Sequence, residues 1–192
     1  MATKTTGSDQ IKSRKRVKEH GEVFTNPREV KAMCDLVGDT ISLPETTVLE
    51  PACGTGNFLA EILVRKMRSI CNGRLIETER DLQSVILAVG SLYGVDIMAD
   101  NVEQTRERLF GIVARFLAFN LFLANFKDET LHKTLVDCDH VLCKNIQVGN
   151  FLQDNLVFCS WKYKVRPGTG QMTLVADKTT KDEIMKDAIV NK

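Results

Sequence analysis

The chain has 192 residues, enough for one domain with a substantial core, and its 43% hydrophobic and 27% charged residues are typical of a globular protein. The formal net charge of +1 neither favours nor excludes a polyanionic partner such as DNA. No run of about 18 apolar residues occurs, so we expect no membrane span, and the first ten residues lack the apolar stretch of a signal peptide.

The N-terminal region is basic. We predict that residues 1–19 form a basic, partly disordered segment ahead of a domain over residues 20–192. The basic side chains of this segment crowd into one stretch: Lys12, Arg14, Lys15, Arg16 and Lys18. Such a run is more often a solvated tail or helix face than a set of phosphate contacts, although contact with DNA stays open.

The first well-marked helix is predicted to begin at Pro27, because proline suits the first helical turn and Asn26 or Thr25 can cap it. Its apolar residues recur at helical spacing and are expected on the buried side: Val30, Met33, Cys34 and Val37.

Apolar periodicity then alternates between strand and helix. We predict strands at 46–49 and 92–97, and a third within 140–152 that Ile146 and Val148 indicate. We predict helices at 57–70, 79–91 and 100–120, a polar stretch between residues 120 and 140, and finally a β-hairpin around Pro167–Gly170 with a polar helix near Thr180. This order is typical of an α/β fold, a parallel sheet with covering helices. Right-handed crossovers bring the carboxyl ends of all its strands to one edge, where ligands bind in such sheets. Glu50, Asp96 and Gly149 should therefore converge.

The six cysteines are scattered and form no CxxC pair. Cys138, His140 and Cys143 are close in sequence, but zinc sites need a second ligand pair at recognisable spacing, which this sequence lacks. We therefore expect no metal site and interpret the cysteines as thiols of a protein in the reducing cytoplasm.

A glycine turn follows the first predicted strand. No lysine follows Gly56 as a phosphate-binding P-loop requires, and Leu59 stands where a dinucleotide fingerprint has its third glycine. Glu50 before the turn would repel a pyrophosphate but pair with an ammonium group, and Asp96 is suited to accept hydrogen bonds from a ribose diol. The pattern favours a nucleoside site without a phosphate, although a simple strand-to-helix turn is the alternative.

Four segments carry a resemblance to a known family. EPACGTGNFL (50–59) resembles the cofactor motif of amino-group DNA methyltransferases, and HGEVFTNPREV (20–30) is similar to the segment before it in adenine-specific enzymes of restriction-modification systems. YGVDIMADNVEQTRERL (93–109) and IQVGNFL (146–152) resemble the second and third strands of these enzymes, in the same order. The resemblance implies a Rossmann-like S-adenosylmethionine-dependent methyltransferase fold, here incomplete and truncated before the fourth strand.

The resemblance also implies roles for individual residues. The residues expected to bind S-adenosylmethionine are Phe24, Thr25, Glu50, Pro51, Cys53, Gly54, Gly56, Asp96, Ile97, Asn150 and Phe151. The first two flank the methionine part, and Glu50 with the backbone of 53–56 holds its amino and carboxyl ends. Asp96 binds the ribose hydroxyls, and the last three contact the adenine, with Ile97 packing on it, Asn150 at its edge and Phe151 stacked against it. The alternatives are that Asp96 caps the next turn and that Phe24 is a buried loop aromatic.

The catalytic segment of the family is not found in this sequence. Its enzymes hold the flipped base with an Asn/Asp-Pro-Pro-aromatic segment, whereas none of the four prolines here is adjacent to another. We therefore expect the cofactor-binding portion of a DNA adenine methyltransferase, inactive alone or completed by a second polypeptide. The partner is expected at the sheet edge left open after the third strand. The alternatives are a non-catalytic methyltransferase-like module and, less favoured, a small-molecule methyltransferase.

Overall fold

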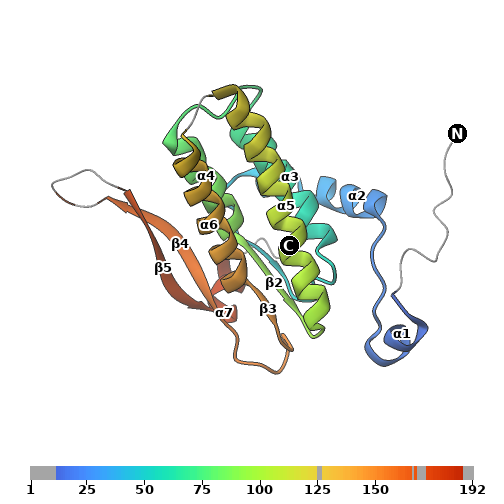
Figure 1. Ribbon diagram of the computed structural model, residues 1–192. Helices are drawn as coiled ribbons and strands as arrows, with labels where there is room; N and C mark the ends of the chain where they lie inside the picture. Colours follow the sequence, from blue (N-terminus) through green and yellow to red (C-terminus); the bar gives the residue numbers. More distant parts are fainter. Residues whose placement is uncertain (1–11, 125–126, 166, 168–171, 188–192) are drawn as a thin grey trace, which may run out of the picture.

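The computed structural model describes residues 12–124, 127–165, 167 and 172–187 (Figure 1). Its elements are α1 (Arg14–His20), α2 (Pro27–Val37), a 3-10 turn η1 (Asp39–Ser42), β1 (Val48–Glu50), α3 (Asn57–Cys71), α4 (Glu79–Gly90), β2 (Leu92–Asp96), α5 (Ala99–Ala124), α6 (Asp128–Asn145), β3 (Ile146–Val148), β4 (Val157–Val165), β5 (Met172–Thr180) and α7 (Lys181–Asp187). The predicted disorder of the first ten residues lies outside the described residues.

The three predicted strands form a parallel sheet in the order β1-β2-β3. Glu50 lies opposite Gly94, and Asp96 lies opposite Val148, so the carboxyl ends of the strands share one edge. The Gly149 amide donates to the Asp96 carbonyl at 3.0 Å, which ties two of these ends together. The predicted convergence of strand ends in an α/β fold is confirmed.

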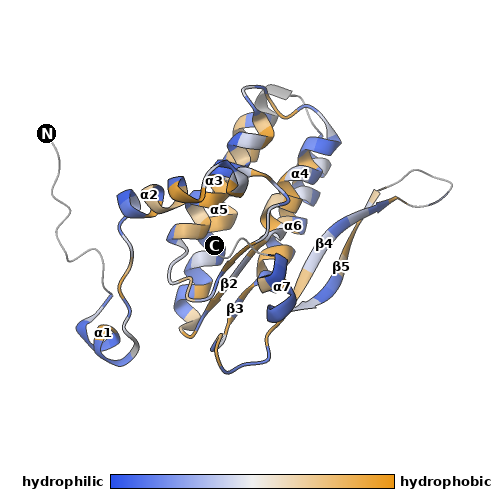
Figure 2. Ribbon diagram, turned by 180° about the vertical axis from the view of Figure 1, so that it is seen from behind, coloured by the Kyte–Doolittle hydropathy of each residue, from blue (hydrophilic) through white to orange (hydrophobic). Residues whose placement is uncertain are grey.

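The helices cover one face of this sheet. Because the strand order runs in one direction, right-handed crossovers place both β1-to-β2 and β2-to-β3 connections on the same side. The helices α3, α4, α5 and α6 therefore pack together as one layer over the buried Leu92 and Ile146 (Figure 1). Their hydrophobic residues gather on the sides that face one another, whereas α1 is largely hydrophilic (Figure 2).

The second face of the sheet is covered by the C-terminal elements. Tyr93 and Val95 of β2 form a small core with Leu156, Phe158 and Ile184. The strands β4 and β5 pair antiparallel, with Val157 opposite Thr180, and α7 follows them. The hairpin and terminal helix predicted from the sequence are confirmed, although the tip of the hairpin, residues 168–171, lies outside the described residues.

Two sequence predictions are wrong. The stretch predicted only as polar after residue 120, together with the first part of the segment 140–152 in which the third strand is expected, forms the 18-residue helix α6. This helix ends at Asn145 and buries Cys138, Val141 and Leu142. Charged residues occupy much of the rest of its surface, where Val136 is also 52% exposed, and this mixture weakens its apolar period. Met33 is also 50% exposed, because α2 buries only a narrow side around Val30 and Cys34.

The parallel sheet has two outer strands, β1 and β3. The Gln147 side chain of β3 donates to the Val157 carbonyl at 2.8 Å, so the start of β4 lies beside that edge. Within the described residues, β1 pairs with β2 only. Among the described helices, none combines the length and the apolar character that a membrane span requires.

Candidate functional site

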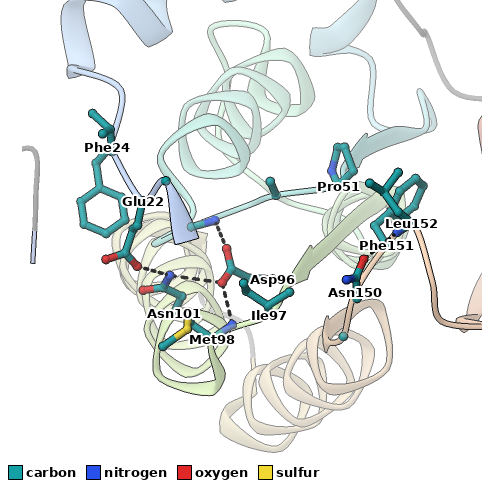
Figure 3. A pocket seen from close by; sticks show the side chains of 15 residues that line it. Glu22, Phe24, Pro51, Asp96, Ile97, Met98, Asn101, Asn150, Phe151 and Leu152 are labelled. Carbon is teal, nitrogen blue, oxygen red and sulfur yellow. Dashed lines mark hydrogen bonds between the residues drawn. The ribbon is translucent and has the colours of Figure 1, made fainter. Parts of the chain in front are cut away.

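A pocket of about 280 Å³ lies at the carboxyl edge of the parallel sheet. Four segments that are distant in sequence line it: 21–24 before α2, 51–54 after β1, 96–101 after β2 and 149–152 after β3. Phe24 and Glu22 stand on one side of the pocket, and Pro51, Phe151 and Leu152 stand on the other (Figure 3).

The glycine turn lets neighbouring side chains lie close to its backbone. Gly54 and Gly56 have φ values of +53° and +78°, in the left-handed region that favours glycine. A Cβ atom on Gly56 would lie 2.8 Å from the Thr105 methyl carbon, and one on Gly54 would lie 3.3 Å from the Phe24 ring. The Thr105 hydroxyl donates to the Gly54 carbonyl at 2.9 Å and holds the turn against α5.

The Asp96 carboxylate is a structural hub at the end of β2. Its Oδ2 accepts from the Gly54 amide at 2.9 Å, and its Oδ1 accepts from the Met98 amide at 2.8 Å and from Asn101 Nδ2 at 3.2 Å. Asp96 thus caps the following turn, the alternative that the sequence left open, and it also fastens the glycine turn.

A polar network extends from Asp96 to the N-terminal segment. Asn101 Nδ2 also donates to Glu22 Oε1 at 2.7 Å, so one buried amide bridges the two carboxylates that line the pocket (Figure 3). Behind Glu22, the Arg16 guanidinium lies 3.0 Å from the Glu22 carboxylate. Arg16 also binds both oxygens of Asp100 at 2.7 Å.

From the sequence, the basic stretch is interpreted as a solvated tail or helix face, or as a set of phosphate contacts, and two of its five cations fit neither interpretation. Arg16 and Lys12 bind acidic side chains of this same chain, and Lys12 Nζ lies 2.9 Å from Asp100. These pairs hold the pKa of Asp100 well below its usual value. The cations anchor the segment that forms one wall of the pocket, because Arg16 contacts Glu22 of that wall as well as Asp100 at the start of α5. Arg14, Lys15 and Lys18 are exposed.

Comparison with protein-family models, curated proteins and solved structures finds no match to this chain.

Most of the predicted cofactor residues line this pocket: Phe24, Pro51, Gly54, Asp96, Ile97, Asn150 and Phe151. The others lie around it and do not line it: Thr25, Glu50, Cys53 and Gly56. The Thr25 carbonyl accepts from Asn57 Nδ2 at 2.9 Å, and the Cys53 amide donates to the Val95 carbonyl at 2.8 Å. These contacts shape the backbone around the pocket.

Both charged residues that line the pocket, Glu22 and Asp96, are acidic. Glu50 lies just outside the lining, and burial raises the pKa of its carboxyl group. Burial likewise raises the pKa of the neighbouring Cys53 thiol to about 12, so this cysteine is a neutral packing group near pH 7. The charged side chains that line the pocket are therefore negative only, although Arg16 offsets Glu22 from outside the lining.

The wall after β3 has its own compact turn. The Asn150 side-chain oxygen accepts from the Leu152 backbone amide at 3.0 Å, and the Asn150 backbone amide donates to the Asp154 carboxylate at 2.6 Å. Asn150 Nδ2 has no hydrogen-bond partner among the described residues, which leaves a donor available for a ligand.

Sequence reasoning missed Glu22, Asn101 and Thr105. Asn101 and Thr105 are 1% and 0% exposed, and they stand four residues apart on the side of α5 that faces the glycine turn. A polar pair at this spacing on the apolar side of a predicted helix is the signal that could have identified them.

Proposed function

We propose that this chain is the S-adenosylmethionine-binding portion of a DNA adenine methyltransferase of restriction-modification type. The observation that carries the proposal is the pocket at the carboxyl edge of the parallel sheet, where predicted residues from four separate segments meet. Ligands of open α/β sheets bind at such an edge. The pocket volume of about 280 Å³ is near the lower end of ligand sites, so the ligand stays partly open to solvent.

The charge of the pocket supports this ligand over a nucleotide. Glu22 and Asp96 line it, and no Lys, Arg or His is among its lining residues. A nucleoside that carries ammonium and sulfonium groups suits these carboxylates. Phosphates are repelled chiefly at Asp96, because Arg16 offsets the charge of Glu22. Phe24 and Phe151 offer apolar surfaces at opposite sides (Figure 3).

Ribose binding at Asp96 requires a rearrangement. A carboxylate has about four acceptor positions, and three hydrogen bonds already end on Asp96, so one position is left for the two hydroxyls of a ribose. The bond from Asn101, the longest at 3.2 Å, is the one that a ribose hydroxyl displaces in this proposal. Asn101 remains bound to Glu22.

The proposal assigns no catalytic residue to this chain. Its 192 residues contain no Asn/Asp-Pro-Pro-aromatic segment, so it does not methylate DNA alone. A second polypeptide that supplies this segment completes the enzyme. The edge after β3, where the sequence predicts this partner, lies beside the start of β4, so the proposal moves the partner to the edge of β1 that pairs with no strand among the described residues. The six free cysteines are compatible with the cytoplasmic location that this function requires.

The test is calorimetric titration of the purified chain with S-adenosylmethionine, S-adenosylhomocysteine, adenosine and ATP. We expect both S-adenosyl compounds to bind, adenosine to bind more weakly, and ATP to bind least because of its phosphates. No binding by any S-adenosyl compound at millimolar concentration contradicts the proposal, and tighter binding of ATP contradicts the assignment of the pocket charge.

A non-catalytic methyltransferase-like module is the second candidate. The observation that favours it is the absence of adjacent prolines anywhere in the sequence. A second polypeptide that restores DNA methylation when mixed with this chain decides for the enzyme, and binding of the cofactor with no restoring partner decides for the module.

A further inference from the structure

The turn formed by residues 149–154 contributes one wall of the pocket, and most of its hydrogen bonds are internal. The amides of Gln153 and Asp154 donate to the Asn150 carbonyl at 3.1 and 2.8 Å. The Gly149 amide joins the turn to the end of β2. These bonds define the shape of the turn, but they leave its orientation beyond Gly149 to contacts from elsewhere in the chain.

One lysine from the C-terminal helix supplies such a contact. Lys181 Nζ donates to the Phe151 carbonyl at 2.8 Å and to the Asp154 carbonyl at 3.1 Å. It also lies 5.4 Å from the centroid of the Phe151 ring, within the range of a cation–π interaction. A single ammonium group thus holds both the backbone of the turn and the aromatic side chain that lines the pocket.

Lys181 is itself held in place. Ile184, one turn later in α7, is 3% exposed and packs in the small core with Tyr93 and Val95 of β2. Thr180 and Glu183 cap the start of α7 reciprocally, with the Thr180 amide donating to the Glu183 carboxylate at 2.8 Å and the Glu183 amide donating to the Thr180 hydroxyl at 3.3 Å. The helix α7, which carries Lys181, is therefore anchored to β2, the strand that ends at Asp96.

We propose that Lys181 is a positioning residue of the pocket: it fixes Phe151 relative to Asp96 and thereby sets the affinity for a nucleoside ligand. Lys181 does not line the pocket and acts through Phe151. The hairpin β4–β5 and α7 thus contribute to the site at a distance. The part of this inference that concerns a ligand rests on the proposed function, whereas the part that concerns the turn does not.

The test compares Lys181→Met, Lys181→Arg and the control Lys178→Met, which removes an exposed lysine of β5. Hydrogen exchange of the peptide 149–155 is measured in the ligand-free proteins. We expect exchange about tenfold faster in K181M, since two charge-assisted bonds are lost, and near wild-type rates in K181R and K178M. Exchange in K181M equal to that in K178M overturns the inference.

Titration with S-adenosylhomocysteine provides the second readout. We expect K181M to bind it about tenfold more weakly and K181R to recover most of the affinity, because the guanidinium also donates to two carbonyls. Faster exchange with unchanged affinity in K181M shows that Lys181 does not set ligand affinity, which overturns that part.

A wild-type chain that binds no S-adenosylhomocysteine counts against the proposed function. The hydrogen-exchange result then tests by itself whether Lys181 holds the turn in place. If K181M loses its cooperative melting transition, Lys181→Gln takes its place with the same expected direction and the same overturning result.

Discussion

Gly54 and Asp96 are 42 residues apart in sequence, and the Gly54 amide donates a 2.9 Å hydrogen bond to the Asp96 carboxylate. This bond joins the turn after β1 to the end of β2 at the point where the pocket opens. The Asp96 carboxylate thus stabilises the fold and is also a candidate ligand-binding group, so removal of this carboxylate should affect folding and binding together.

We expect Asp96→Ala to lower the free energy of unfolding by roughly 2 kcal/mol, because the three donors it now satisfies lose their acceptor. S-adenosylmethionine binding should weaken by roughly 1–3 kcal/mol. Urea unfolding and calorimetry measure the two effects. The control is Asp139→Ala, which removes an exposed carboxylate of α6 away from the pocket and should change the free energy of unfolding by less than about 0.5 kcal/mol. Equal effects of the two substitutions contradict the role assigned to Asp96.

Gly56→Ala should destabilise the protein more than Gly73→Ala does. Both glycines have φ values near +80°, but the new Cβ atom meets the Thr105 side chain at 2.8 Å only at position 56, and nothing lies within 4 Å at position 73. The left-handed backbone costs about 1–2 kcal/mol at each site, and overpacking adds about 1–3 kcal/mol at Gly56.

Thermal or urea unfolding of both variants measures this difference. The double variant Gly56→Ala/Thr105→Ser removes the Thr105 methyl group and keeps its hydroxyl, so it should recover part of the loss. Similar destabilisation by G56A and G73A shows that the contact with Thr105 carries no cost.

We expect the free energy of unfolding to depend on pH because of Lys66. It is fully buried on α3, where its ammonium donates to the carbonyls of Leu43 at 2.6 Å and Thr46 at 2.7 Å. Burial lowers the pKa of Lys66 from its usual 10.5 to about 7. Between these values the unfolded chain holds the proton and the folded chain releases it, so stability rises with pH from about 7 toward 10.5.

The measurement is urea unfolding of the wild type and Lys66→Met at several pH values between about 7 and 9, where each pH unit contributes up to about 1.4 kcal/mol. The wild type should gain stability relative to K66M as pH rises. All other titratable groups are the same in both proteins, so their contributions to the pH dependence cancel in this comparison. A constant difference contradicts the lowered pKa.

The chain alone should leave DNA unmethylated even with saturating S-adenosylmethionine. Methyl transfer requires the target nitrogen to be held in line with the sulfonium, and such positioning supplies several kcal/mol of the barrier. The sequence has no segment that resembles the one that holds it. A radiolabelled-methyl assay on mixed-sequence duplex DNA measures this, and clear incorporation above background shows that the chain carries its own catalytic group.

The sequence by itself determined most of the elements, α6 excepted, and the edge of the sheet at which the site lies. The strand ends at Glu50 and Asp96 and the glycine turn between Cys53 and Gly56 are marked by local patterns, because apolar periodicity and glycine preferences depend on near neighbours. The helix α6 escaped these patterns because its buried residues form only a weak stripe among charged ones.

The tertiary structure decided which side chains meet at that edge. Arg16 reaches Asp100 across 84 residues, and Lys181 reaches Phe151 across 30. Lysines and arginines carry no local mark of such partners, because their donor groups bind whichever carboxylate or carbonyl oxygen folding brings near them. Only the packed chain shows that Arg16 anchors one wall of the pocket and Lys181 the other.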